Sequence, residues 1–173
     1  SDPSTDVGLM IQALDTSQRA LVAFAGSINR TGSNIEMRVG DNNPCGTSGS
    51  CAESQNVYYL SDAGAVEGTT PVHEVGHVLQ MREFGQDFLN VNYLLDGIDG
   101  HSLTSIEYDS SATTEGWADY VAMVSWWDPN DSSSRPDYWG YKIEKANPYG
   151  NSCSDASGME LQVARGFWDM DDV

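Results

Sequence analysis

The chain has 173 residues, of which 39% are hydrophobic and 10% aromatic, a composition that predicts a globular protein rather than a disordered one. Its 26 acidic residues outnumber 8 basic ones, for a formal net charge of −18. This charge excludes nucleic acids and anionic membranes as partners, because both require a basic surface. No run of residues approaches the roughly 20 apolar residues of a membrane-spanning helix.

The first part of the chain carries signals for a helix and then for strands. Residues 6–25 have apolar side chains at helical spacing and predict one or two helices. Residues 35–39 alternate apolar and polar side chains like a strand, and a Gly-rich and Asn-rich loop follows. Residues 56–60 are rich in β-branched and aromatic side chains and predict a second strand. The apolar helical positions are Leu9, Ile11, Leu14, Leu21 and Phe24.

Two of the three cysteines lie close together in the predicted loop. Cys45 and Cys51 flank the sequence GTSGS, which is flexible enough to bring the two side chains together, so we predict a disulfide between them. The alternative is a pair of free thiols in a reducing compartment. Cys153 is left over. Together with the acidity, the predicted disulfide favours a secreted or extracellular protein.

Residues 70–80, TPVHEVGHVLQ, open a predicted helix over 71–84. Thr70 is expected to cap this helix and Pro71 suits its first turn, where a missing N–H costs nothing. The apolar side chains that would form the opposite, buried stripe are Val72, Val75 and Leu79.

On this helix, His73 and His77 would lie ~40° apart on one face, one turn above each other. Glu74 would lie ~100° round from His73, beside that face. Two imidazoles at this spacing suit zinc, and a carboxylate beside a zinc-activated water can act as general base. The alternative is a helix with two incidental histidines. It is disfavoured because the chain has only three histidines and the pattern fixes two of them.

A catalytic zinc needs a third protein ligand. The metzincin arrangement would place a histidine at position 83, but that residue is Glu83, and Gln80 replaces the glycine that this arrangement expects. A second helix is predicted over about 114–127, with Thr114 as its cap and Glu115 at its start. It places Glu115 and Asp119 four residues apart on one face, and small alanines would allow close approach to another helix.

HEVGH at 73–77 followed by Glu115 and Asp119 resembles the gluzincins, the thermolysin-like and related zinc peptidases. The resemblance implies that His73, His77 and Glu115 bind zinc, that Glu74 is the general base, and that Asp119 orients a ligand histidine without binding the metal itself. It covers roughly residues 56–127. It further implies that the predicted strand holds an extended peptide substrate, with the residues Val57, Tyr58, Tyr59 and Leu60.

With a third helix predicted near 158–170, strands lie early and helices late, which indicates an α+β fold. We expect a single zincin-like catalytic domain over 1–173, with a natural chain that can continue beyond 173. Its upper lobe, about 1–80, would hold a mixed sheet, a backing helix and the active-site helix. Its lower lobe, about 81–173, would be mainly helical.

Several assignments stay open at this stage. The gap from His77 to Glu115 is longer than in thermolysin, and Glu115 could instead complement the positive end of its helix. Other candidate ligands are Glu107, Asp109 and His101. The residue that stabilises the oxyanion is not ranked among Tyr108, Tyr120, Tyr138, Tyr141, His101 and Arg165.

These patterns predict a zinc metalloendopeptidase that hydrolyses peptide bonds of proteins or peptides with one catalytic Zn²⁺. One alternative is a zincin-fold binding module without proteolytic activity, which the intact Glu74 disfavours. Another is a non-peptidase zinc amidase with a cysteine ligand, but the residues around Cys51 do not supply that motif. Ca²⁺ is a further candidate for the acidic loops, yet LDGIDG at 95–100 lacks the spacing of an EF-hand.

Overall fold

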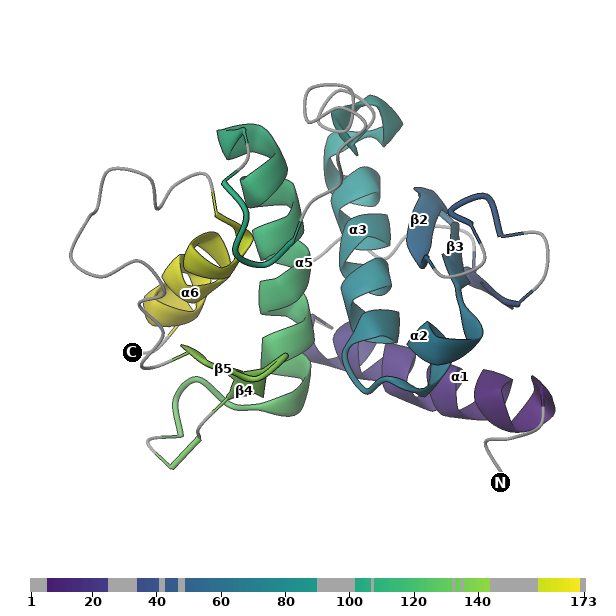
Figure 1. The fold of residues 1–173 in the computed structure, drawn as a ribbon, viewed down its shortest axis with the longest axis horizontal. Coiled ribbons are helices and arrows are strands. Elements are labelled where there is room, and N and C mark those ends of the chain that lie inside the picture. Colours follow the sequence, from purple (N-terminus) through teal and green to yellow (C-terminus); the bar gives the residue numbers. More distant parts are fainter. Residues whose placement is uncertain are drawn as a thin grey trace. The chain divides into compact units, whose positions relative to one another are not determined.

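The computed structural model describes residues 6–24, 34–40, 43–46, 49–89, 102–106, 108–131, 133–134, 136–143 and 159–171. These residues form a mixed α+β protein, as the sequence predicts (Figure 1). The chain divides into two compact units, Ser1–Phe88 and Leu89–Val173. The zincin fold and the single catalytic domain stay predictions.

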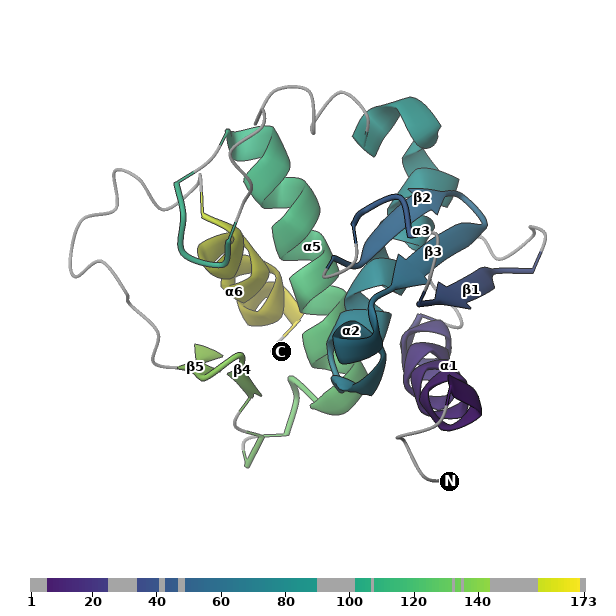
Figure 2. The same cartoon turned by 45° about the vertical axis from the view of Figure 1, so that its right-hand side comes forward.

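The first unit contains a three-stranded sheet. Strands β1 (Glu36–Val39), β2 (Cys51–Ser54) and β3 (Val57–Leu60) lie in the order β1–β3–β2 (Figure 2). β1 is parallel to β3 and β2 is antiparallel to it. The predicted strands at 35–39 and 56–60 are confirmed, whereas β2 begins where the sequence indicated only a loop.

Three helices accompany this sheet: α1 (Asp6–Ala23), α2 (Asp62–Val66) and α3 (Thr70–Phe84). α1 packs against α3, α1 also contacts β1, and α3 contacts β2 and β3 (Figures 1 and 2). The helix α3, which carries the HEVGH motif, is therefore held by both the sheet and the N-terminal helix.

The face that α1 buries differs from the one its apolar residues predict. Ile11 and Leu14 are 52% and 50% exposed. The buried positions within α1 are small residues at helical spacing and include Ala13, Thr16, Ser17 and Ala20, while the predicted Phe24 is buried directly after the helix. Small side chains allow α1 to approach its neighbours closely, and the Ser17 hydroxyl shares a hydrogen bond of 2.6 Å with the Tyr58 hydroxyl on β3.

The start of α3 also differs from the prediction by one residue. Thr69 is the N-cap and makes no side-chain capping bond, while Thr70 is the first helical residue. The hydroxyl of Thr70 instead donates to a carboxylate oxygen of Glu67 at 2.6 Å. Pro71 lies in the first turn as expected, and Gly85 ends the helix with a positive φ of 93°.

The far end of α3 is tied to the turn between β2 and β3. The side-chain amide of Gln55 donates to the carbonyl of Met81 at 2.9 Å. Arg82 donates from Nε to the Gln55 carbonyl at 2.6 Å and from Nη2 to Oδ1 of Asn56 at 2.8 Å. These three bonds fix the hairpin turn to the last turns of the helix.

The second unit is built on two helices, α5 (Asp109–Trp126) and α6 (Glu160–Asp171), which pack side by side (Figure 1). The predicted third helix is confirmed as α6. A small hairpin of β4 (Asp137–Tyr138) and β5 (Tyr141–Lys142) completes the described part of this unit.

The two helices meet closely at Gly116, next to the candidate ligand Glu115. A Cβ atom at this position would lie 2.7 Å from the Glu160 carbonyl oxygen and 2.7 Å from Cβ of Val163. Beyond this point the contact continues through aromatic rings, because Trp117 and Phe167 stack edge to face with centroids 5.4 Å apart. A residue without a side chain at position 116 therefore sets the approach of α6 to α5.

Candidate metal centre

The two histidines of the motif face each other on α3. Their Nε2 atoms are 3.1 Å apart, and the ring planes are nearly perpendicular at 86°. His77 is 2% exposed, whereas His73 is partly exposed. Because the residues are four apart, the helix itself brings their Nε2 atoms to one point, as the sequence predicts.

The other ring nitrogen of His77 has a partner on the same helix. Nδ1 of His77 lies 3.1 Å from Oε1 of Gln80, and the Gln80 side chain is buried, at 4% exposed. An amide oxygen accepts hydrogen bonds, so this contact favours the tautomer of His77 with its proton on Nδ1. The Nε2 lone pair of His77 then points to His73.

Glu74, the candidate general base, is buried on α3 beside the histidines, with 5% of its surface exposed. Its charge acts on Tyr58 of β3: burial raises the pKa of the Tyr58 hydroxyl to about 12, the Ser17 hydrogen bond opposes this, and the Glu74 carboxylate adds to it. The Glu74 carboxylate and the Tyr58 hydroxyl are therefore coupled electrostatically.

Glu115 lies in the interior of α5, because this helix begins at Asp109 with Tyr108 as its N-cap. The expectation that Thr114 caps the helix and that Glu115 opens it is wrong. Glu115 lies more than one turn from the helix start, so stabilisation of the positive helix end, which acts within the first turn, does not explain its placement. Its side chain is 2% exposed.

Asp119, one turn after Glu115, accepts a hydrogen bond of 2.7 Å at Oδ1 from the hydroxyl of Tyr138 on the β4–β5 hairpin. Burial, the Asp119 charge and the hydrogen bond to it raise the pKa of Tyr138 well above its usual value, so the hydroxyl stays a donor at neutral pH. The expected role of Asp119 as the partner of His73 stays a prediction.

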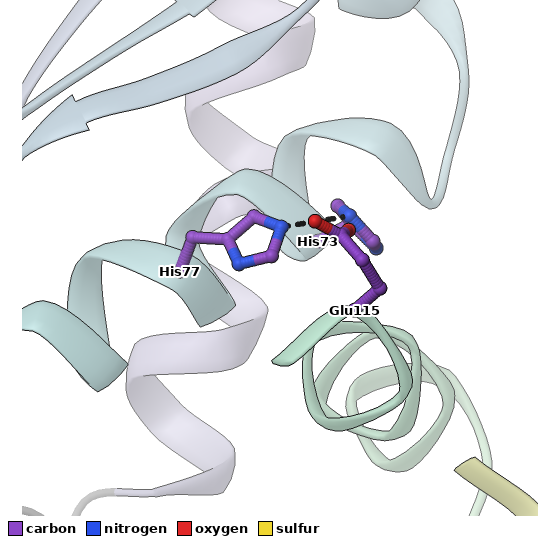
Figure 3. Close-up of side chains that lie close together, drawn as sticks. All are labelled: His73, His77 and Glu115. Carbon is purple, nitrogen blue, oxygen red and sulfur yellow. Dashed lines mark hydrogen bonds between the residues drawn. The ribbon is translucent and has the colours of Figure 1, made fainter. Parts of the chain in front are cut away.

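The ligand atoms of His73, His77 and Glu115 all lie within 4.8 Å of one another (Figure 3). Two nitrogen ligands at ~2.0–2.1 Å from a tetrahedral zinc would be roughly 3.3 Å apart, close to the 3.1 Å between the two Nε2 atoms. Two imidazoles and one carboxylate are a donor set that suits a catalytic metal. This group could hold a metal ion.

The strand assigned to the substrate, Val57–Leu60, is the central strand β3. It pairs with β1 along one edge and with β2 along the other. The backbone of β3 is therefore already paired with a neighbouring strand along both edges. A peptide that extends this sheet beside α3 would meet β2, whose second edge has no strand partner among the described residues.

The predicted disulfide is present and joins Cys45 to Cys51, with their Cα atoms 6.1 Å apart. Cys51 is also the first residue of β2. Cys153 lies outside the described residues, as do the candidate ligands His101 and Glu107.

The remaining candidates for the oxyanion are dispersed, and their geometry does not rank them. The hydroxyl of Tyr120 donates to Asp171 at 2.9 Å, and that of Tyr138 is committed to Asp119. Arg165 lies 3.8 Å from Asp169 on the same helix, and Tyr108 is exposed. Tyr141 lies in β5. Asp109, which the sequence offered as another candidate metal ligand, is the first residue of α5.

Sequence reasoning missed two contacts of the candidate residues. Gln80 was read only as a departure from the metzincin pattern, although its spacing of three from His77 on a helix was a usable signal. Tyr138 carried no local signal, because its hydrogen bond to Asp119 spans nineteen positions of the chain.

Comparisons with known proteins leave the centre to be interpreted on its own geometry. No protein-family model matches the chain, and no curated protein or solved structure matches it either. In the described part of the chain, no helix is both long and apolar enough to cross a membrane.

Proposed function

We propose that this chain is a zinc-dependent metallopeptidase of the gluzincin type. One observation carries the proposal: the two histidines and Glu115 bring their ligand atoms within 4.8 Å of one another, and the buried Glu74 lies between the histidines in the chain. A metal site with only a structural role requires no carboxylate at that position.

The donor set favours zinc among the biological cations. Magnesium and calcium prefer sites made of oxygen ligands, whereas imidazole nitrogen suits zinc and its transition-metal neighbours. Three protein ligands leave one position for water or substrate, which is the arrangement of a catalytic rather than a structural zinc. The residues that would hold the ion are His73, His77 and Glu115.

When bound, zinc would supply Lewis acidity, which polarises a carbonyl group and makes water acidic near neutral pH. The carboxylate of Glu74 would accept a proton from the attacking water and pass it to the leaving amine nitrogen. Its burial supports this role, because a carboxylate with little water around it exchanges protons with the bound reactants rather than with bulk solvent.

The substrate would be a polypeptide in an extended conformation. The resemblance assigns substrate binding to Val57–Leu60, but β3 has both edges paired. We therefore assign the substrate-binding edge to β2 (Cys51–Ser54), which contacts α3. The disulfide at the start of β2 supports a secreted location, since disulfides persist in oxidising compartments.

The proposal is tested with the purified protein and an unfolded protein substrate such as casein. We expect hydrolysis that a zinc chelator abolishes and that added zinc restores. Glu115→Ala should remove zinc or weaken its binding severely, whereas Asp119→Ala should weaken it by about 10–100-fold, the usual cost of losing a supporting residue. Bound zinc without hydrolysis of a broad peptide library would contradict the peptidase and favour the binding module. Tight zinc and full activity in Glu115→Ala would contradict the gluzincin assignment.

A further inference from the structure

Gln80 is a buried polar side chain that lies one turn after His77 on α3. It is 4% exposed, and its Oε1 lies 3.1 Å from Nδ1 of His77. Residues three apart on a helix are neighbours, so the geometry of α3 is sufficient to bring these two side chains together. The contact lies within one helix of one compact unit.

This contact determines which nitrogen of His77 carries the proton. The neutral imidazole has one N–H donor and one acceptor nitrogen, and the amide oxygen can only accept. With the proton on Nδ1, Nε2 of His77 keeps its lone pair. In the contact of 3.1 Å between the two Nε2 atoms, His77 is then the acceptor and His73 the donor.

We propose that Gln80 is a positioning residue for the metal, which holds His77 in the tautomer whose Nε2 carries no proton and can act as a ligand. The inference rests on the proposed metal site. Ligand histidines generally donate their second N–H to a fixed acceptor, which sets both the tautomer and the ring orientation. Here the acceptor, Gln80, lies on α3, the same helix that carries His73 and His77.

An amide suits this position better than a carboxylate would. Gln80, Glu74 and His77 are all buried residues of α3, in a chain with a net charge of −18. A neutral amide accepts the hydrogen bond without the cost of burying another negative charge. It also adds no repulsion to the buried Glu74 carboxylate on the same helix.

The test compares the wild type with Gln80→Met and Gln80→Glu. Methionine is similar in length and unbranched but cannot accept this bond well, whereas glutamate keeps an acceptor oxygen. The first readout is the ¹⁵N NMR signal of His77 after metal removal, at a pH of about 8, where imidazoles are neutral. We expect the wild type and Gln80→Glu to show the Nδ1–H form and Gln80→Met to lose it.

The second readout is zinc affinity, measured by competition with a chromophoric chelator. Gln80→Met should bind zinc about 10–100-fold more weakly than the wild type, and Gln80→Glu should recover most of the loss. If wild-type His77 carries its proton on Nε2, the inference fails even if Gln80→Met does not fold. Equal zinc affinity in the wild type and Gln80→Met would also overturn it and leave the zinc site intact. A wild type with the Nδ1–H form that binds no zinc would instead overturn the proposed function.

Discussion

The hydroxyl of Tyr138 donates a hydrogen bond of 2.7 Å to the Asp119 carboxylate, and both side chains are buried. Tyr138 precedes a tight turn at Trp139 and Gly140, which have positive φ values of 51° and 84°. Such a turn joins two strands with the twist they require. The hairpin thereby holds a tyrosine against α5 at the residue one turn beyond Glu115.

Tyr138→Phe should lower the free energy of unfolding by about 1–3 kcal/mol, because it removes a donor from a buried carboxylate and keeps the ring. Urea unfolding of both proteins measures the difference. Tyr141→Phe is the matched control in the same hairpin, where Tyr141 is only half-buried, and a surface-type change of about 0.5 kcal/mol or less is expected. Equal effects of the two substitutions would contradict a specific role of the Tyr138 bond.

Stability should fall at alkaline pH because buried tyrosines must ionise when the chain unfolds. The folded-state pKa of Tyr58 is raised to about 12, and that of Tyr138 is raised well above its usual value, each chiefly by burial. A raised folded-state pKa contributes stability that is complete below the unfolded pKa of about 10 and is lost as pH rises through the folded value. Urea unfolding at a series of pH values from 8 upwards measures the slope of the free energy of unfolding against pH.

Tyr58→Phe and Tyr138→Phe should each flatten this alkaline slope, since phenylalanine does not titrate. An unchanged slope in both variants would show that these tyrosines do not carry the pH dependence.

Gly116→Ala should destabilise the second unit, because the new Cβ would meet the backbone oxygen of Glu160 and Cβ of Val163, each at 2.7 Å. Overpacking of this kind costs about 1–3 kcal/mol. Gly166→Ala on α6 is the control: nothing lies within 4 Å of its Cβ, and alanine should stabilise the helix by about 1 kcal/mol. The midpoint temperature of thermal unfolding should fall for Gly116→Ala and rise for Gly166→Ala. A neutral Gly116→Ala would mean that α5 and α6 can separate without cost.

Glu74→Gln should retain one zinc per chain and lose turnover by about 10²–10⁴-fold or more, since the amide keeps the shape but cannot accept a proton. Metal content by atomic absorption and casein hydrolysis measure the two effects. Glu83→Gln, an exposed position on the same helix, should leave both unchanged. Near-normal turnover in Glu74→Gln would rule out Glu74 as the base.

Mass analysis of the non-reduced protein should find Cys45 linked to Cys51. Substitution of both cysteines by serine should cost about 2 kcal/mol, the loop-closure value for a separation of six residues. Two free thiols in protein purified from an oxidising medium would contradict the bond and would remove most of the argument for secretion.

The elements that carry strong local patterns were predictable. The histidines of α3 could be placed on one face from their spacing alone, and β1, β3 and α6 follow from periodicity. The buried face of α1 could not be predicted from hydrophobicity. Its buried positions include the small residues Ala13, Ser17 and Ala20, whereas the larger Ile11 and Leu14 are exposed. Hydrophobicity predicts burial only where there is room for a large side chain.

The start of α5 was misplaced for a related reason. Thr114 has a side chain that can cap a helix, but its hydroxyl donates to the Ser110 carbonyl at 3.0 Å inside α5. A threonine in the sequence therefore does not by itself mark the start of a helix. β2 was missed because a bulge between Ala52 and Ser54 interrupts its alternation. Contacts between distant positions, such as Tyr138 with Asp119, need the folded chain.

The bonds from Arg82 and Gln55 have a consequence for how β3 is aligned. The β2–β3 hairpin contains a bulge between Ala52 and Ser54, so two residues of β2 lie opposite one residue of β3 and the pairing changes along the hairpin. A slip by one residue would turn Tyr58 away from Ser17 and exchange the two faces of the strand. The hydrogen bond from Arg82 to the Gln55 carbonyl holds the turn in place and so favours the observed alignment of the two strands. An arginine about one and a half turns after His77 thus contributes to the strand alignment of the neighbouring sheet.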